Sequence, residues 1–411
     1  MYWYLAKLAY KNLVRQKRRT LVTCLTLSVA ILSYIATDGL LAGLDQMAID
    51  NLISYESGHI QVLDPRYLDE RDELPLEYTF PVGELPQQIS SVEGVEAVTP
   101  RITFSALLNN GMDELLVVAL GIDPDTDPRV FKLPEHITGE MFEPESYQAV
   151  IGESLADLME LTIGDYFTLI TKTKTGAFQA IDVQISGLAK TPHPEINLSS
   201  VFIPYDVAAK ALGMPGQATE LFIRIGDGQD VDGVTVAVNQ ALDASAPVRA
   251  YSWREVSADF LAMSESEAQI MGVFLGLILL IGIVGVVNTV LLGAMERVKE
   301  IGTMKAMGLQ EREIIMEFAF EALGIGVLGS LVGVALGALL NWFLVDVGMD
   351  LTYFFGDMSV GYPVTGSIHS VWNPQTMVQS FVMGVLICLV ASYLPARAAA
   401  VKDPIQSLQA H

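Results

Sequence analysis

The stretch MERVKEIGTMKAMGLQERE, residues 295–313, decides the fold of this chain. It is rich in charged side chains, yet long apolar stretches flank it on both sides. An apolar stripe recurs within it at three-residue spacing and faces a charged stripe; the apolar residues are Met295, Val298, Ile301 and Met304. This pattern is typical of a short amphipathic helix, and Gly308 is placed to end it.

The flanking stretches are long enough to cross a membrane. The 411 residues are 51% hydrophobic with a mean hydropathy of +0.40. A spanning helix needs about 20 mostly apolar residues, and four stretches qualify: 21–44, 270–295, 318–345 and 377–396. No small-residue cleavage site ends the first stretch before Asp38, so we expect an uncleaved signal anchor there. The sequence therefore predicts four transmembrane helices.

Charge asymmetry predicts the orientation. Residues 1–20 hold six Lys and Arg and no acid, whereas residues 45–268 hold 12 Lys and Arg against 37 Asp and Glu. The 346–373 loop has three Asp and no Lys or Arg, while the 296–317 linker and the 397–411 tail carry basic residues. The positive-inside rule then places both termini and the linker in the cytoplasm, and the long acidic segment outside.

Residues 45–268 predict an α+β domain between the first two spans. Strand-like alternation occurs in 58–63, 180–188 and 219–225, and 114–122 is typical of a buried strand. Helical patterns are interleaved at 83–92, 153–161 and 207–213, the last with Asp206 as its N-cap and Gly213 just past its end. The expected fold is a membrane protein of four transmembrane α-helices with a large α+β extracytoplasmic domain.

We find no motif in the sequence that is typical of a catalytic site or a metal site. The acidic runs 64–77 and 122–129 lack an EF-hand glycine and glutamate at the required spacing, which favours solvated acidic loops. The five histidines are scattered. Cys24 and Cys388 lie in predicted spans, where small buried hydrophobic side chains are expected. We expect no catalytic residue and no metal site.

The chain also lacks a phosphate-binding GxxxxGK[ST] motif, and its spans hold few ionisable residues, Asp38 and Glu321, both near ends. Ion-coupled carriers bury several such groups. An external energy source is therefore expected. The amphipathic helix could receive force from a soluble partner or could lie in the lipid headgroups, and its own residues leave both alternatives open.

The segment ERVKEIGTMKAMGLQEREI resembles the coupling segment of the FtsX-like ABC permease family, with its pattern E-R-x-x-E-I-G-x-x-[KR]-A-[LM]-G. The residues that match it are Glu296, Arg297, Glu300, Ile301, Gly302, Lys305, Ala306, Met307 and Gly308. The resemblance implies that these residues contact a separate ATPase.

The resemblance covers most of the chain. Residues 9–23 are similar to the family's basic amphipathic helix before span one, so 1–20 is expected to be a cytoplasmic amphipathic helix, and 395–408 resembles the closing P-x-R-x-A motif. The segments between resemble the exported domain of lipoprotein-releasing (Lol-type) and macrolide-exporter (MacB-type) permeases: 57–67, 92–108, 121–133, 150–170 and 252–256. The chain begins directly at the amphipathic helix, which favours the Lol-type subunits.

The resemblance implies a multi-pass protein of the bacterial inner membrane. It would pair with a second permease chain, identical or paralogous, and with ABC ATPase subunits that bind the ATP and Mg, while this chain binds no cofactor. A periplasmic carrier or tunnel protein and membrane lipid are further expected partners, and nucleic acid is not. The implied function is release or export of lipoproteins or other amphiphiles. Efflux of small hydrophobic molecules or peptides, and signalling to a cell-wall hydrolase, are the alternatives.

Three further sets of residues are candidates for function. Gly329, Gly333 and Gly337 recur at intervals of four, which predicts close packing against another span. The segment 190–200 is the candidate carrier-docking loop. A substrate seam at the outer ends of spans one and two would be lined by Leu32, Ile35, Leu40, Met271, Phe274, Leu275 and Ile278, which could equally be ordinary packing or lipid-facing residues.

Overall fold

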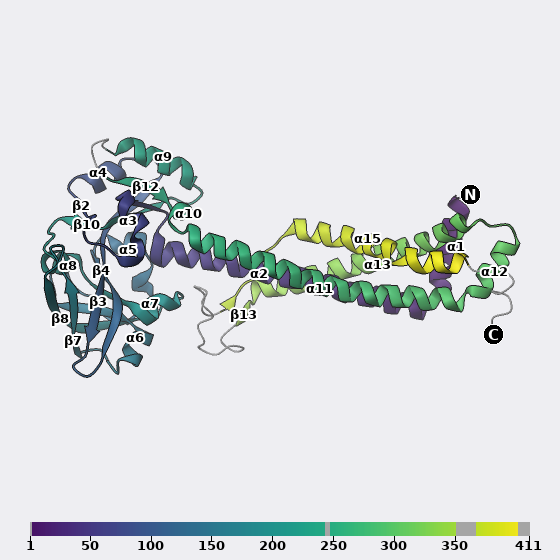
Figure 1. The fold of residues 1–411 in the computed structure, drawn as a ribbon, viewed down its shortest axis with the longest axis horizontal. Coiled ribbons are helices and arrows are strands. Elements are labelled where there is room, and N and C mark those ends of the chain that lie inside the picture. Colours follow the sequence, from purple (N-terminus) through teal and green to yellow (C-terminus); the bar gives the residue numbers. More distant parts are fainter. Residues whose placement is uncertain (1, 243–246, 351–366, 402–411) are drawn as a thin grey trace. The chain divides into compact units, whose positions relative to one another are not determined.

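The computed structural model describes residues 2–242, 247–350 and 367–401. It divides into two compact units (Figure 1). Of the described residues, the helical unit comprises 2–45, 264–350 and 367–401, and the α/β unit comprises 46–242 and 247–263. Each unit is described by itself.

The helical unit contains the amphipathic and the apolar helices. They are α1 (Tyr2–Arg15), α2 (Lys17–Asn51), α11 (Ala258–Glu296), α12 (Val298–Ala306), α13 (Glu311–Asp346) and α15 (Pro374–Val401). Within the described ranges, four helical stretches are long and apolar enough to cross a membrane: Lys17–Ser57, Ala258–Gly293, Glu311–Asp346 and Pro374–Ala398. Each overlaps one of the four predicted stretches.

Helix α13 packs against both α2 and α15 (Figure 1). Its glycines allow this, because Gly326 lies against Val385 and Cys388 of α15 while Gly333 lies against Ile31 of α2. Apolar side chains from all four long helices form the core between them, including Leu27, Ile31, Val286, Ile325 and Ala391. Cys388 is fully buried there, and Cys24 is half-buried with its thiol 3.7 Å from the carbonyl oxygen of Ile325.

The α/β unit is built on a mixed ten-stranded sheet. Its order is β12-β1-β11-β3-β4-β9-β6-β8-β5, with β7 pairing with β3 and β8. Only β4 with β9 and β6 with β8 run parallel among the described strand pairs. The strands are β1 (Ile60–Leu63), β3 (Val95–Asn109), β4 (Glu114–Ile122), β5 (Ile137–Gly139), β6 (Gln148–Gly152), β7 (Tyr166–Lys172), β8 (Phe178–Ala189), β9 (Ser200–Pro204), β11 (Glu220–Ile225) and β12 (Arg249–Ser252).

Short helices, turns and small strand pairs make up the remaining elements. The short helices of the α/β unit are α3 (Pro65–Asp69), α4 (Leu85–Ser90), α5 (Asp127–Val130), α6 (Glu153–Leu158), α7 (Pro194–Ser199), α8 (Tyr205–Ala211), α9 (Val231–Ala241) and α10 (Trp253–Val256). A π-helical turn covers Leu52–Ser57, and 3-10 turns cover Arg71–Glu73 and Leu133–His136. Two small strand pairs join β2 (Phe80–Pro81) to β10 (Gln217–Ala218), and β13 (Met349–Asp350) to β14 (Ser367–Ile368).

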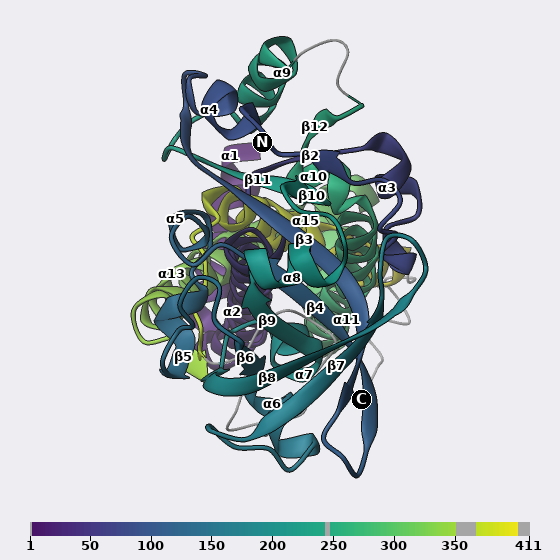
Figure 2. The same cartoon turned by 90° about the vertical axis from the view of Figure 1, so that its left-hand side faces the viewer.

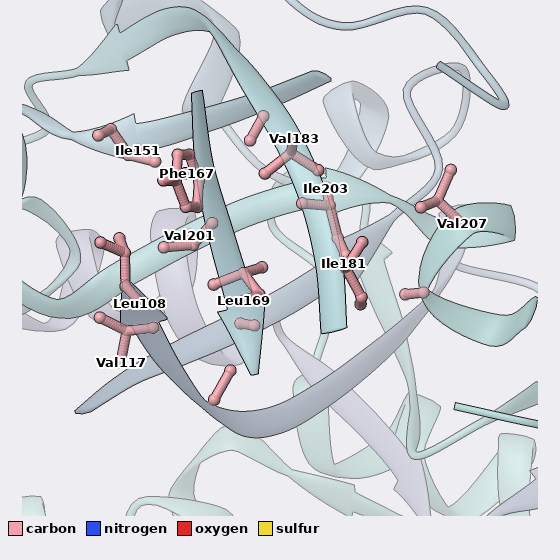
Figure 3. Close-up of a cluster of buried hydrophobic side chains, with 14 of the residues drawn as sticks. Leu108, Val117, Ile151, Phe167, Leu169, Ile181, Val183, Val201, Ile203 and Val207 are labelled. Carbon is pink, nitrogen blue, oxygen red and sulfur yellow. The ribbon is translucent and has the colours of Figure 1, made fainter. Parts of the chain in front are cut away.

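Strand β3 links the two halves of the sheet, as Figure 2 shows. Its first half pairs with β11, its last residues pair with β7, and β4 lies along most of it. Alternate residues Ile102, Phe104, Ala106 and Leu108 enter one core, as the two-residue period of a strand requires. This core also contains apolar side chains of β6 to β9. Figure 3 shows part of it, with Leu108 of β3 labelled. A second core forms around β1, β11, β12 and α9.

Two local predictions about the α/β unit are wrong. Helix α8 begins at Tyr205 with Pro204 as its N-cap, so Asp206 lies inside the first turn, although Gly213 does follow the end in a left-handed conformation (φ 72°). Residues 122–129 are not a fully solvated acidic loop, because Asp127 is 1% exposed and accepts two hydrogen bonds from Arg101, at 2.7 and 2.9 Å. The Arg101 guanidinium also lies 3.4 Å from the centre of the Phe131 ring.

Candidate coupling site

The charged stretch folds as a short helix between two long ones. Helix α11 ends at Glu296, α12 follows, and Gly308 takes a left-handed φ of 94° that lets the chain turn back. The N–H of Gly308 donates to the carbonyl of Lys305, which closes the end of α12. Gln310 and Glu313 then form a reciprocal cap at the start of α13. The turn between α12 and α13 is therefore defined by hydrogen bonds on both of its sides.

Arg297 occupies the junction between α11 and α12 and points inward. Only 5% of its side chain is exposed. Its Nη2 donates to Glu317 and its Nη1 to Glu321, both at 2.9 Å, and its Nε donates to Glu300 at 3.0 Å. A single buried guanidinium therefore connects α12 to two carboxylates on successive turns of α13.

The N-terminal helices complete this cluster. Asn12 of α1 donates to Glu317 at 2.8 Å, and Arg15 donates to Glu300 at 3.0 Å. Arg19 of α2 donates to Glu321 at 2.5 Å. Gly293 of α11 lies against the Arg19 guanidinium, where a Cβ would collide with it. We call these seven polar residues the coupling cluster: Asn12, Arg15, Arg19, Arg297, Glu300, Glu317 and Glu321.

The coupling cluster balances three guanidinium groups against three carboxylates. Burial alone would raise the pKa of Glu300, but the hydrogen bond from Arg297 and the charges of Arg297 and Arg15 lower it overall. Burial opposes the charge of Arg297, yet the carboxylates of Glu317 and Glu321 hold its pKa above the usual value. Removing one partner of a buried ion pair costs about 3–5 kcal/mol, because the other charge stays buried without compensation. Geometry and charge therefore fix α12 firmly to its neighbours.

An apolar contact supports the same junction. Ile301 is 2% exposed and packs with Ile314 and Phe318 of α13 and with Ala396 and Ala400 of α15. The structure thus corrects the prediction for Arg297 and Ile301, which were expected at the ATPase surface. Both side chains face the protein interior, so they position α12 and cannot form its outer surface. Gly302 is buried with them.

The outer face of α12 is formed by other residues. Thr303, Ala306 and Met307 are exposed, Met307 by 70%, and Gly308 and Glu296 are exposed beside them. Glu300 is half-buried in the coupling cluster, and Lys305 is half-buried and lies 3.7 Å from Glu311. One feature of the sequence points to the cluster: Glu317 and Glu321 are four residues apart beside an apolar stretch, so they share a helix face.

The glycine row of α13 faces α2. Gly329 lies against Cys24 and Leu27, Gly333 against Ser28 and Ile31, and Gly337 against Ile35, at distances that leave no room for a side chain. Ser28 donates to the carbonyl of Gly329 at 2.8 Å across this contact. Small residues let two helix backbones approach in this way where lipid supplies no hydrophobic drive.

A second glycine pair lies at the other end of α2. Gly39 and Gly43 face the backbone of residues 369–371, and the N–H of Val371 donates to the carbonyl of Gly39 at 3.0 Å. Asn341 of α13 accepts a hydrogen bond from Ser370 at 2.5 Å beside Gly39. The chain that leads into α15 is therefore fastened to both α2 and α13.

The predicted seam residues do not share one environment. Ile35 is 3% exposed and packs on Gly337, as in the alternative of an ordinary packing residue. Leu275 is also buried. Phe274 is 56% and Met271 39% exposed on α11, and the half-buried members are Leu32, Leu40 and Ile278.

The candidate docking segment 190–200 does not project as a free loop. It forms α7, and its His193, Ile196 and Asn197 are buried. Asn197 and Thr191 exchange backbone and side-chain hydrogen bonds of 2.8–3.0 Å, which fold the segment onto itself. Pro192 and Pro194 flank the buried His193, and Pro194 begins this short helix.

Comparison with known families agrees with this architecture. Residues 20–241 match the MacB-like periplasmic core domain, and residues 272–404 match the FtsX-like permease C-terminal region. The chain belongs to the FtsX-like, MacB-type family of ABC transporter permeases.

Relatives of this MacB-type permease include both complete and partial matches. An ABC transporter permease of Methanocaldococcus jannaschii is 23% identical over 98% of this chain and 96% of its own length. The macrolide export ATP-binding/permease protein MacB of Agrobacterium fabrum is 25% identical over 95% of this chain, which spans 58% of that relative. The lipoprotein-releasing system transmembrane protein LolC of Neisseria meningitidis is 22% identical over 77% of this chain and 79% of its own.

Among solved structures, the periplasmic region of MacB from Actinobacillus actinomycetemcomitans is similar to this permease. It is 12% identical, covers 55% of this chain and 97% of its own, and has a TM-score of 0.37. The family assignment rests on the two family models.

Proposed function

We propose that this permease relays ATP-driven motion of a separate ABC ATPase to its α/β unit and so releases or exports lipoproteins or other amphiphiles. The α/β unit would lie outside the cytoplasmic membrane, and both termini and α12 in the cytoplasm. This chain would bind no cofactor itself, since ATP and Mg would bind the ATPase.

The coupling cluster is the observation that carries the proposal. A helix that transmits force must move as one body with the spans it drives. Arg297 meets this requirement, because it connects α12 to Glu317 and Glu321 of α13, while Arg19 connects Glu321 to α2. A push on the exposed face of α12 would therefore reach α1, α2 and α13 together.

The exposed face of α12 suits a protein partner. Ala306 and Met307 follow Thr303 by about one helical turn, and all three are exposed. Methionine adapts well to a partner surface, and the neighbouring Gly308 allows close approach of a backbone. We propose that this face, rather than the buried Arg297 and Ile301, contacts the ATPase.

The substrate side of the proposal rests on the exposed apolar side chains of α11. Each CH₂ that leaves the bilayer for water costs about 0.8 kcal/mol, so an acyl chain needs an apolar surface to receive it. Phe274 and Met271 offer such surface, and a second permease chain, identical or paralogous, would complete the seam. A periplasmic carrier or tunnel protein would accept the substrate.

A photo-crosslinking experiment tests the ATPase contact. A photoreactive amino acid at Met307 should capture a chain that mass spectrometry identifies as an ABC ATPase by its phosphate-binding motif. The matched control is Leu331, which is 60% exposed on α13 and lies in a predicted span. Crosslinks from Leu331 but not from Met307 would show that α12 is not the contact.

A second experiment separates the substrate classes. A photoreactive amino acid at Phe274 should capture an acylated protein if lipoprotein release is the function, whereas a captured small hydrophobic molecule or peptide would favour efflux. Capture of a cell-wall hydrolase regulator by the α/β unit, with no substrate at Phe274, would favour signalling. Phospholipid alone at Phe274 would exclude this residue from the seam.

A further inference from the structure

An open groove lies on the helical unit beside the start of α2. Its volume is about 360 Å³, and its lining is almost entirely apolar. Leu13 of α1, Leu21 and Leu25 of α2, and Val332 of α13 form its walls, and Lys17 lies at its end. The lining runs from Lys17 to Ser28 along α2, which is roughly 16 Å of helix. The groove is therefore long, apolar and basic at one end.

The ammonium group of Lys17 is free to bind a ligand. Its neighbours Arg15 and Arg19 are engaged by Glu300 and Glu321. By contrast, Lys17 is exposed, and within the described residues its ammonium makes no hydrogen bond or ion pair. A cation next to an apolar groove has the chemistry to hold an anionic headgroup while the groove holds an acyl chain.

The surroundings of the groove carry the complementary charge for an anionic membrane surface. The first 20 residues contain six Lys and Arg and no acid. Trp3, Tyr4 and Tyr10 of α1 are exposed beside these basic residues. Tryptophan and tyrosine collect at the headgroup level of a membrane, and basic amphipathic helices bind anionic lipid surfaces. Helix α1 thus has the composition of an interfacial helix.

We propose that this groove is a binding site for one anionic diacyl phospholipid of the cytoplasmic leaflet. One acyl chain lies between Leu13, Leu21, Leu25 and Val332, and the phosphate pairs with the ammonium of Lys17. The site is separate from the proposed seam at Phe274. It lies on the same helical turns as Arg15 and Arg19, so an occupied groove holds the N-terminal helices beside the coupling cluster.

Native mass spectrometry of the full chain tests the site. The purified protein is mixed with equal amounts of phosphatidylglycerol and phosphatidylcholine, and the ratio of the two bound lipids is measured. The wild-type protein should prefer phosphatidylglycerol. K17Q should reduce that preference about fivefold, the share that one lysine contributes near an anionic surface. K11Q removes the same charge from an exposed position of α1 outside the groove and should keep the preference.

A second pair of variants, one inside the groove and one outside it, tests the apolar part of the site. V332W should fill the groove and reduce retention of both lipids several-fold, whereas L331W, on the next residue of α13 but outside the lining, should retain them. If K17Q and K11Q changed the lipid preference equally, the lipid would be bound by a general basic surface. If the wild-type protein had no headgroup preference, the bound lipid would be annular lipid. Either result would overturn the proposal. So would lipid retention by V332W that equals that of L331W.

Discussion

The guanidinium of Arg297 donates to the carboxylate of Glu321 over 2.9 Å, with both side chains at most 5% exposed. This contact joins the first residue after α11 to the third turn of α13. An ion pair at this depth is stable only if every charge in it stays balanced.

Arg297 is therefore the residue whose loss should cost most stability in the helical unit. R297M leaves Glu317 with Asn12 as its remaining hydrogen-bond donor in the coupling cluster, and we expect a loss of about 3–5 kcal/mol. Thermal unfolding in detergent micelles measures it, with K11M as the exposed-charge control. The double variant R297M/E317Q should recover part of the loss, because it removes the uncompensated carboxylate. A double variant no more stable than R297M would contradict this account.

Acid should weaken the pair between Glu300 and its two arginines. The pKa of Glu300 lies below its ordinary value of 4.5, so ionised Glu300 stabilises the fold at neutral pH. This contribution is lost as the pH falls through the lowered folded-state pKa. The wild-type protein should unfold at a higher temperature than E300Q at pH 7, and the difference should shrink below about pH 4. The control is E296Q, which makes the same change at an exposed position and should unfold at the same temperature as the wild-type protein at pH 7. A difference in unfolding temperature between the wild-type protein and E300Q that stayed constant at all pH values would argue against the ion pair.

Gly333 should not tolerate even one added methyl group. Its Cβ would lie 2.9 Å from Cβ of Ile31 and 3.0 Å from Cα of Ser28, so α2 and α13 would have to separate. We expect G333A to lose about 1–3 kcal/mol of stability. G276A on α11, where no atom lies within 4 Å, should be neutral or stabilising by up to about 1 kcal/mol. The measurement is the midpoint of thermal unfolding of G333A and of G276A in detergent. Equal changes in the two midpoints would show that the glycine row is not a tight contact.

The α/β unit contains a comparable buried pair. R101M leaves Asp127, the first residue of α5, buried and without its arginine, and should destabilise the unit by about 3–5 kcal/mol. Arg254 and Asp232 form an exposed pair at 3.7 Å, so R254M should cost no more than about 1 kcal/mol. Hydrogen exchange of residues 95–130 in the full chain measures the first loss locally. Unchanged exchange in R101M would show that Asp127 finds another partner.

The elements that depend on local pattern could be predicted from the sequence. The four apolar stretches, the strands around 58–63, 180–188 and 219–225, and the short helix before Gly308 all follow from period and composition. The inward orientation of the Arg297 side chain could not be predicted, because its partners lie 20 and 24 residues away on another helix. The burial of Ile35 depends on Gly337, and the folding of 190–200 depends on the Thr191–Asn197 contacts. Such pairings exist only once the tertiary structure has formed.

The equal count of arginines and glutamates in the coupling cluster also constrains how this protein can diverge. Loss of the charge of Arg19, Arg297, Glu317 or Glu321 leaves its counterpart without a partner in a buried site, so a single substitution is penalised and a paired one is tolerated. Residues that touch in this way tend to vary together. Among members of this family, an arginine lost at the position of Arg19 or Arg297 should therefore be accompanied by a neutral residue at the position of Glu321 or Glu317. The four positions would then be inherited as linked pairs.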